Sequence, residues 1–571
     1  MPSGLRGTRC PTRCCCKNWV EVPALPSSLD LPRLILDLRA DLRRRFQFHL
    51  DERQDAFRSW LVTTGVHEYA SLYNDAALAR WLRRPSQFPG ISMLQEQVWQ
   101  ARQDVQAAHP LPDDGAGFVD WFYRHGVGEH GLWPWLTPAE RQRVCLQEGP
   151  WQAQLLQRAT DDLLHAEPPL PATQRPWGVN LIGYAYGQLG IGEDVRMAAR
   201  ALQAAGVPVC MVNFKPGNDV AQNDRSMHDC VVSGPGPYAV NVFCLTAMEH
   251  GRFFAEQGPR QLQGRYNIGY WPWELGRWPD AWAQLVHLVD EVWVSTRHTH
   301  DAVAPVCATL HRPVPVHVMP MAVELGPVER GSRATVRQRW GLPLQARLMV
   351  FTFDLNSSIH RKNPQAVVES FLRAFPRSDW APEQVGLVIK VHPPRRRHAA
   401  WDALKRLAAQ DDRLHIIEQT LSRPALLALY RACDVFVSLH RAEGFGRGIA
   451  EALQLGLHVV STHYSGNVDF CSAPEFAGRV DLIDYRLVKV RPGQYPFGAG
   501  QVWANADLNH AARCLRGYVL RWPPGRSLPR QQVPEGGWPL FQAAQAGLRY
   551  AARLGQVRAG LADADLAWPA V

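Results

Sequence analysis

The chain of 571 residues contains only six lysines, although lysine and arginine together number 62. Arginine therefore carries nearly all of the positive charge, so a lysine that persists, such as Lys362 or Lys390, is mildly informative. The net charge of +9 is a small excess for this length and suits an anionic ligand or a membrane surface. No basic run is interleaved with aromatic residues, which argues against a nucleic-acid partner.

Long apolar runs are also missing. No stretch reaches the ~20 residues of a membrane span, and the N-terminus lacks the apolar core of a signal peptide. We therefore expect a cytoplasmic protein, with peripheral contact at the inner face of a membrane left open. The twelve cysteines form no disulfide or zinc framework. Eight are scattered and predicted to be buried free thiols in a reducing compartment. Four crowd a terminus predicted to be a disordered leader or to follow a start codon placed too early: Cys10, Cys14, Cys15 and Cys16.

Apolar residues make up 46% of the chain, which allows a sizeable core, and a length prior of ~150 residues per domain gives three to four domains. The N-terminal part shows helical spacing of apolar residues at 34–39, 75–82, 117–123 and 151–156. A proline-rich linker follows at 168–176. We predict four parts: residues 1–170 (helical region with leader), 177–340 and 341–525 (two Rossmann-like domains), and 526–571 (linker and helix).

From residue 177 onward, strand and helix patterns alternate. The first set predicts strands at 179–184, 207–213, 240–245, 266–271, 291–295 and 316–319, with a loop at 185–192 and a helix at 193–205. The second predicts strands at 348–353, 385–391, 414–417, 434–440 and 458–462, with helices at 364–375 and 424–432, and a late helix at 540–554 that packs back onto the first half. The fold class is therefore α/β, with two doubly wound parallel sheets facing a cleft.

The most informative stretch is Glu443-Gly-Phe-Gly-Arg-Gly-Ile-Ala-Glu451. It lies between a predicted buried strand and a helix, so it forms a strand-to-helix turn. Such a turn presents free backbone N–H groups and a positive dipole end to an anion. The two carboxylates flank that anion and can accept hydrogen bonds from hydroxyls. An anion with hydroxyl-bearing groups on both sides describes a nucleotide-diphosphate sugar.

This motif, its strand and the two-sheet layout resemble the retaining GT-B glycosyltransferases of family 4, the glycosyl transferases group 1. The resemblance covers about residues 177–520 and leaves the N-terminal helical region outside. Its signature is Glu-x7-Glu, here Glu443 and Glu451, set between Ser438-Leu-His-Arg-Ala and Ala452-Leu-Gln-Leu-Gly. Gly190-Ile-Gly-Glu-Asp is similar to the glycine loop of the family's acceptor-side domain.

The resemblance implies a role for each residue of the motif. Glu451 would accept hydrogen bonds from the ribose hydroxyls, as a carboxylate can from a vicinal diol. Glu443 would contact the transferred sugar and help to stabilise a positively charged transition state. Gly444, Phe445 and Gly446 would bring backbone amides to the diphosphate. The alternatives are a helix N-terminal Glu for Glu451 and a loop salt bridge for Glu443.

The leaving diphosphate also needs cations. Lys362 matches the lysine that the family places at the start of its second domain. The arginine that usually precedes it is missing, with Asp354 or Ser357 near its position. Arg361 or Lys390 is predicted to supply that charge. Arg447, an added cation in the motif itself, is equally compatible with a phosphate contact and a surface position.

In the first half, Gly190 and Gly192 are predicted to let the loop approach the donor and acceptor, the alternative being a tight turn without a ligand. The loop lacks the third glycine of the dinucleotide-binding pattern, which argues against an NAD enzyme. Glu274 and Trp273 follow a strand and are candidates for acceptor binding, as is His250. Core packing is the alternative for the aromatic residues and for the histidine.

The resemblance implies a retaining transfer of a hexose from a nucleotide-diphosphate sugar to a glycan or lipid-linked acceptor, in the synthesis of a cell-surface polysaccharide or lipopolysaccharide. The leaving diphosphate would take the acceptor's proton, so no protein base, metal or further cofactor is implied. Two alternatives stay open. One is a GT-B nucleotide-sugar epimerase, and the other a non-catalytic scaffold that binds a sugar or a partner.

Overall fold

The computed structural model describes residues 29–46, 51–148, 170–216, 220–310, 312–355, 357–393, 398–525 and 532–563. The predicted leader with its four cysteines and the predicted helix at 151–156 lie outside these ranges. The chain divides into two compact units. One contains the described residues up to Pro171 together with Gly251–Gly264, and the other contains Ala172–His250 and the chain from Arg265 onward. The boundaries of the four predicted domains stay a prediction.

The first unit is helical, as its apolar spacing predicts. Several of its helices begin at a side-chain cap, for example Ser92, which forms a capping box with Gln95. Phe122 and Trp133 are buried, as expected for core aromatic residues, whereas Trp121 is half-buried. Its helices are α1 (Leu31–Leu38), α2 (Ala40–Arg45), α3 (Asp51–Trp60), α4 (Val66–Glu68), α5 (Ala76–Leu82), α6 (Met93–Ala101), α7 (Gln103–Ala108), α8 (Gly115–Trp121), α9 (Val127–Glu129), α10 (Pro138–Glu148) and the end of α13 (Ala247–Gln257).

The second unit begins with a seven-stranded parallel sheet in the order β3-β2-β1-β4-β5-β6-β7. All six predicted strands of this half are present, within two residues at each end, and β3 is the strand that the sequence reading missed. All the strands are parallel, but their order along the chain changes direction between β1 and β4, as in the doubly wound dinucleotide-binding folds. The strands are β1 (Val179–Gly183), β2 (Val209–Asn213), β3 (Val231–Val232), β4 (Val240–Cys244), β5 (Tyr266–Tyr270), β6 (Glu291–Val294) and β7 (Val316–Val318).

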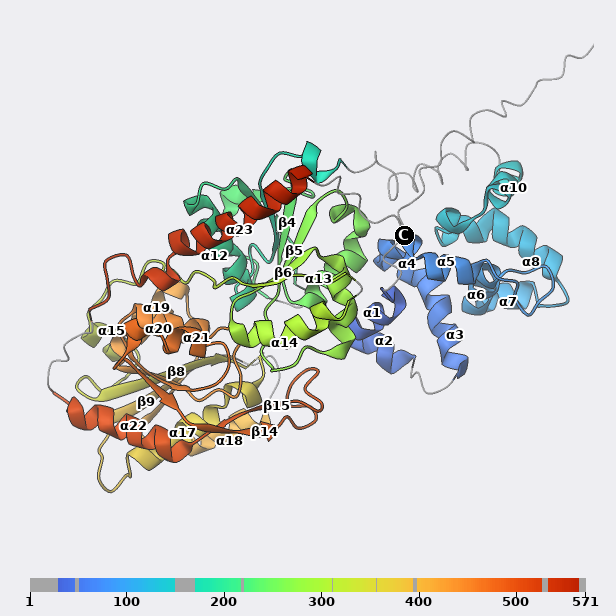
Figure 1. Ribbon diagram of the computed structural model, residues 1–571. Coiled ribbons are helices and arrows are strands. Elements are labelled where there is room, and N and C mark those ends of the chain that lie inside the picture. Colours follow the sequence, from blue (N-terminus) through green and yellow to red (C-terminus); the bar gives the residue numbers. More distant parts are fainter. Residues whose placement is uncertain are drawn as a thin grey trace, which may run out of the picture. The chain divides into compact units, whose positions relative to one another are not determined.

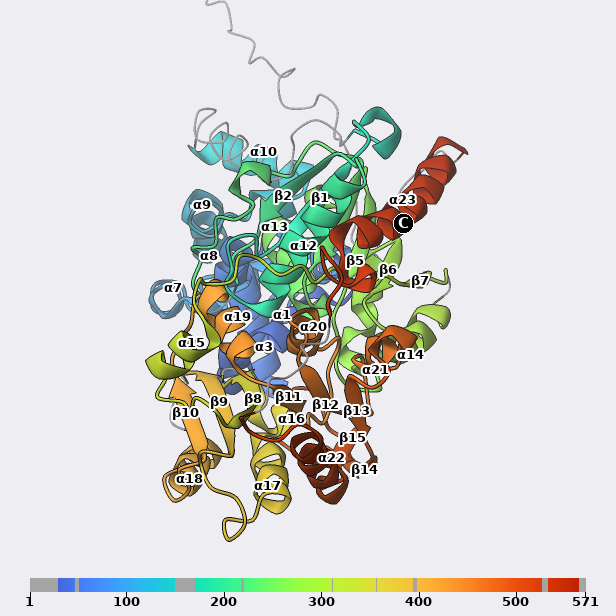
Figure 2. The ribbon, with the colours of Figure 1, turned by 90° about the vertical axis from the view of Figure 1, so that its left-hand side faces the viewer.

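A second parallel sheet repeats this topology with six strands, in the order β10-β9-β8-β11-β12-β13. Its point of reversal lies between β8 and β11, and the strands fan out across the lower part of Figure 2. The sheets confirm the predicted α/β fold class with two Rossmann-like halves. The strands are β8 (Arg347–Asp354), β9 (Val385–His392), β10 (Leu414–Glu418), β11 (Val435–Ser438), β12 (His458–Thr462) and β13 (Val480–Ile483).

The helices of this unit follow the strands. One prediction is wrong in detail: α12 begins at Gly190, not Glu193, so Gly190 and Gly192 lie in its first turn and not in the preceding loop. The helices are α12 (Gly190–Ala204), the start of α13, α14 (Arg297–Ala308), α15 (Arg333–Arg339), α16 (Ile359–Lys362), α17 (Pro364–Ala374), α18 (Ala399–Ala408), α19 (Arg423–Ala432), α20 (Arg447–Gln454), α21 (Val468–Cys471), α22 (Leu508–Arg521) and α23 (Ala543–Asp563).

The last helix, α23, packs along α12, and the two lie side by side in Figure 1. Their backbones approach so closely that a Cβ at Gly547 would lie 2.0 Å from the carbonyl oxygen of Ala201. The hydroxyl groups of Tyr550 and Tyr270 are 3.1 Å apart. The prediction that a late helix returns to the first half is confirmed, although the helix begins three residues later and continues further than 554.

Of the eight cysteines that the structure describes, all are free thiols. The prediction that they are buried holds for five, Cys210, Cys244, Cys307, Cys433 and Cys471, and is wrong for the other three, which are half-buried.

Candidate active site

A cavity of about 570 Å³ lies where the carboxyl ends of the two sheets face each other. Gly190 and Thr246 line it from the segments after β1 and β4, the point of reversal in the first sheet. Asp354 and Ser438 line it from the ends of β8 and β11, the corresponding point in the second. Ligands of doubly wound folds bind at such points, and this volume suits a small organic ligand.

The Glu443–Glu451 motif forms one wall of this cavity. Gly446 has a φ of +95°, a backbone conformation that favours glycine, and it starts α20 without a side-chain cap. The first amides of α20 are therefore not satisfied by a capping side chain. Gly444 lies so close to the first half that a Cβ there would be 2.8 Å from the carbonyl oxygen of Trp273. The carbonyl of Gly444 accepts a hydrogen bond from Thr296 at 2.9 Å.

Glu443 is buried and faces two cations from α16. Its carboxylate forms an ion pair with the ammonium of Lys362 and another, at 3.1 Å, with Arg361. Burial raises the pKa of Glu443, but Lys362 and then Arg361 outweigh it and lower the pKa to about 2. Glu443 is therefore ionised at any physiological pH. The loop carboxylate, the predicted lysine and the neighbouring arginine form one charge group at the cavity.

Arg361 also reaches across the cavity to the first half. Its Nε lies 2.9 Å from the carboxylate of Glu274, and its Nη1 donates a hydrogen bond to the carbonyl of Ala442 at 2.9 Å. Glu274 in turn accepts a hydrogen bond from the hydroxyl of Tyr495. Burial lowers the pKa of Arg361, but Glu274 and Glu443 raise it by more. The pKa therefore lies above the ordinary value for arginine, and the guanidinium stays charged. Glu274, predicted as an acceptor contact, lies beside the predicted leaving-group cations.

Glu451 is buried inside α20 and lines the cavity. Its Oε1 accepts a hydrogen bond from Nη1 of Arg423 at 2.7 Å. Arg423 is the first residue of α19. Arg423 could not be selected from the sequence, because its position relative to Glu451 depends on how α19 and α20 pack.

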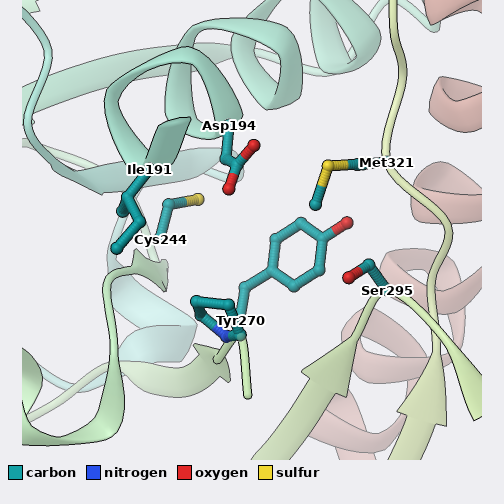
Figure 3. A pocket seen from close by; sticks show the side chains of 7 residues that line it. Ile191, Asp194, Cys244, Tyr270, Ser295 and Met321 are labelled. Atoms are coloured by element: carbon teal, nitrogen blue, oxygen red, sulfur yellow. The ribbon is translucent and has the colours of Figure 1, made fainter. Parts of the chain in front are cut away.

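Arg447 lines the cavity and does not lie on the outer surface, so the surface position is excluded and a phosphate contact stays a prediction. Its guanidinium forms an ion pair with Asp194 of α12, and Nη2 lies 3.2 Å from the sulfur of Met321. Burial lowers the pKa of Arg447, but Asp194 and then Glu193 raise it more. Figure 3 shows the carboxylate of Asp194 and the ring of Tyr270 in a small recess beside Met321. Asp194 is a second site residue that sequence analysis missed.

The two predicted glycines of the first half differ. Gly190 lines the cavity, and a Cβ there would meet no other atom within 4 Å. Gly192 does not line the cavity, and a Cβ there would lie 2.2 Å from the carbonyl oxygen of Gly187. Gly190 is therefore open to a ligand. Gly192 is required because the preceding loop packs tightly against the first turn of α12, which matches the alternative of a tight turn without a ligand.

Two predicted residues lie away from the cavity. His250 is fully buried, with its ring stacked on Phe243 at 3.6 Å and its Nδ1 3.3 Å from the indole nitrogen of Trp271. Its prediction as an acceptor contact is wrong, because burial makes it a core residue and lowers its pKa to about 3. Lys390 lies inside β9, opposite Thr352 of β8, and is not part of the cavity wall. The nearby cations at the wall are Arg361, Lys362 and Arg447.

Trp273 is both a cavity residue and a core residue. It lines the cavity, yet it is buried against Trp282, with ring centroids 4.7 Å apart, and its indole N–H donates to the carbonyl of Arg277 at 2.8 Å. The ring of Tyr495 packs against it from the second half at 5.9 Å. An aromatic group therefore forms the cavity wall beside Glu274.

Among the described residues there is no cluster of three or more His, Cys, Asp or Glu side chains suited to a metal ion. Within the same ranges, no helix has the length and apolar character needed to cross a bilayer.

The fold and the site define the class of protein. It is an α/β protein with two parallel sheets, and carboxylates and cations cluster where the strand ends face each other. Residues 357–475, which include Lys362, Glu443 and Glu451, match the family model of the glycosyl transferases group 1. The chain thus carries a glycosyltransferase domain of this group, which confirms the family and the enzyme class predicted from the sequence. No curated protein matches the chain.

Several solved structures are similar to the chain at low identity. Sucrose-phosphate synthase from Thermosynechococcus elongatus is 16% identical over 68% of this chain and 99% of that one, with a TM-score of 0.44. Anabaena HepE, in complex with UDP and glucose, is 13% identical over 68% and 100%, with a TM-score of 0.41. The E. coli trehalose-6-phosphate structure bound with UDP-2-fluoro glucose is 12% identical over 66% and 99%, with a TM-score of 0.43. These likenesses are distant, and the fold class stands on the chain's own sheets.

Proposed function

We propose that the protein transfers a hexose, with retention of configuration, from a nucleotide-diphosphate sugar to a hydroxyl of a glycan or lipid-linked acceptor. The observation that supports this most is the ion pairing of Glu443 with both Lys362 and Arg361 beside the uncapped start of α20. Cations and free amides suit a leaving diphosphate, and carboxylates suit the hydroxyls on either side of it.

Each side chain then has a task. Glu451, held by Arg423, binds the ribose hydroxyls, and Gly444, Phe445 and Gly446 lead the backbone to the diphosphate. Lys362 and Arg361 stabilise its negative charge as it leaves.

At the other end of the donor, Glu443 contacts the hexose. Glu274 and Trp273 hold the acceptor, since a carboxylate beside an aromatic wall suits a sugar ring and its hydroxyls. Gly190, on the wall that the first half contributes, leaves room for the donor and the acceptor.

The transfer needs no protein base. The bond between the anomeric carbon and the diphosphate oxygen breaks, and a bond to the acceptor oxygen forms on the same face of the sugar. The acceptor proton passes to the leaving diphosphate oxygen. Catalysis is then mainly positioning of the two substrates and stabilisation of the leaving group by preorganised charge.

The experiment is a calorimetric screen of UDP-, GDP- and ADP-hexoses, starting with UDP compounds, followed by product analysis with candidate acceptors. Wild type should bind one class of donor, and Glu451→Ala should lose most of that binding. Glu383→Ala, which changes an exposed carboxylate outside the cavity, is the control. Binding by none of the donors would sink the proposal.

Product analysis separates the alternatives. An epimerase would change the sugar without an acceptor, and a non-catalytic scaffold would bind it and leave it unchanged. We further propose, from the resemblance alone, that the acceptor belongs to a cell-surface polysaccharide or lipopolysaccharide pathway and that the enzyme works on the cytoplasmic side of the membrane.

A further inference from the structure

An antiparallel hairpin follows the residues that match the family model. Its strands, β14 (Tyr485–Lys489) and β15 (Val502–Ala506), form a two-stranded sheet separate from both parallel sheets. The register pairs Leu487 with Ala504 and Lys489 with Val502. The family resemblance assigns no task to this hairpin.

The hairpin concentrates exposed apolar side chains. Ten large hydrophobic residues of the described chain are exposed, and four of them lie between 485 and 502: Tyr485, Leu487, Phe497 and Val502. Directly opposed residues of an antiparallel pair share a face, so Tyr485, Leu487 and Val502 lie on one face, with Val502 diagonal to Leu487. Single exposed hydrophobic residues are ordinary, but a group on one face marks an interaction surface.

The same segment carries charge of one sign. From Tyr485 through Ala506 there is no aspartate or glutamate, while Arg486, Lys489 and Arg491 are all exposed. Lys489 is one of only six lysines in the chain. A surface that combines an exposed tyrosine and aliphatic side chains with a local excess of cations is complementary to an anionic lipid headgroup layer.

The loop between these strands reaches the active-site cavity. Tyr495 and Pro496 line the cavity, and the hydroxyl of Tyr495 donates to Glu274. The ring of Phe497 packs on Trp282, with centroids 5.2 Å apart. One hairpin therefore carries both an exposed cationic apolar face and a wall of the proposed acceptor site.

We propose that residues 485–502 dock the protein on an anionic membrane surface. Tyr485, Leu487 and Val502 enter the headgroup region, while Lys489, which shares their face, and Arg491 contact lipid phosphates. Docking of this kind brings the proposed acceptor side of the cavity near the bilayer, where a lipid-linked acceptor would lie. That last step rests on the proposed function, but binding to the membrane does not.

A second copy of this chain is the competing occupant of the surface. A symmetric dimer through this face would place the cations of one hairpin against the same cations of the other. Like charges across an interface are unfavourable, whereas an anionic bilayer neutralises them. The charge pattern therefore favours the membrane.

The test is co-sedimentation with vesicles of phosphatidylglycerol and phosphatidylcholine in equal parts, compared with vesicles of phosphatidylcholine alone. Wild type should bind the anionic vesicles, and binding should fall at about 0.5 M salt because the charges are screened. L487D should weaken binding about tenfold or more, because it removes an apolar side chain that the membrane would bury and adds a negative charge. L520D, which changes an exposed leucine of α22 outside the hairpin, should bind as wild type does.

Replacement of Lys489 and Arg491 by glutamine should weaken binding about fivefold for each charge removed. Nucleotide binding and thermal unfolding, measured on the same variants, report whether the fold is intact. The proposal is overturned if wild type fails to sediment with anionic vesicles, or if L487D and L520D behave alike. It is also overturned if L487D instead converts a dimer to a monomer in analytical ultracentrifugation. Loss of transferase activity with vesicle binding intact would count against the proposed function alone.

Discussion

Arg447 of α20 forms an ion pair with Asp194 of α12, so a charge contact joins the two halves across the cavity. Arg361 and Glu274 form a second such contact. Five carboxylates and three cations line the cavity, and each of the three cations is paired with a carboxylate. A diphosphate that enters the cavity must therefore compete with the protein's own carboxylates for these cations.

This competition predicts that Asp194→Asn tightens the binding of a nucleoside diphosphate, by about three- to tenfold, because it removes one negative charge and releases Arg447. Arg447→Gln should weaken binding by a similar factor. Isothermal titration calorimetry at low and at moderate salt measures both. Weaker binding by Asp194→Asn would mean that Asp194 holds Arg447 in place for the ligand and does not compete with it.

The proposed contact between Glu451 and the ribose predicts that removal of Glu451 abolishes discrimination between ribose and 2′-deoxyribose. Wild type should bind a nucleoside diphosphate about tenfold or more tightly than its 2′-deoxy form, because a carboxylate accepts hydrogen bonds from both ribose hydroxyls. Glu451→Ala should bind the two forms nearly equally. Arg423→Gln should reduce the difference in part, because Arg423 orients Glu451. If wild type does not distinguish the two forms, Glu451 does not bind the ribose.

The cations of α16 predict a loss of rate. Lys362→Met should lower kcat about 100-fold, which is the usual effect of removing one group that stabilises developing charge. Its effect on donor affinity should be smaller, since the charge on the leaving oxygen grows in the transition state. Lys405→Met, in a half-buried lysine of α18 that does not line the cavity, is the matched control and should leave kcat unchanged. Equal losses in affinity and in kcat/KM with kcat unaltered would place Lys362 in ground-state binding only.

Most strands of both sheets could be predicted because their apolar runs are bounded by turn residues, although β3 and β13 were missed. The motif could be predicted because Glu443 and Glu451 lie close in sequence. Arg423 and Asp194 could not, because each reaches the motif through the packing of a separate helix. The position of His250 depends on the fold in the same way: nothing in its local sequence shows that Phe243 and Trp271 enclose it. The hairpin at 485–506 was missed because its first strand is exposed and lacks a buried face.

The buried state of His250 predicts a loss of stability in mild acid. Burial lowers the pKa of this imidazole to about 3, whereas the unfolded chain protonates it near its ordinary value of 6.5. The neutral histidine therefore contributes stability that is fully present above about pH 6.5 and is lost as the pH falls from there towards 3. Each pH unit in that range costs at most about 1.4 kcal/mol from this one group.

His250→Gln keeps a side chain that can accept the hydrogen bond of Trp271 but does not titrate. It should be less stable than wild type at pH 7.5, because it loses the ring stacked on Phe243. Between pH 7.5 and 5.5 its unfolding free energy should fall less steeply than that of wild type, by roughly 1 kcal/mol over the interval. Urea unfolding at the two pH values measures this difference. Parallel slopes for the two proteins would show that His250 titrates in the folded state as it does in the unfolded chain, contrary to its burial here.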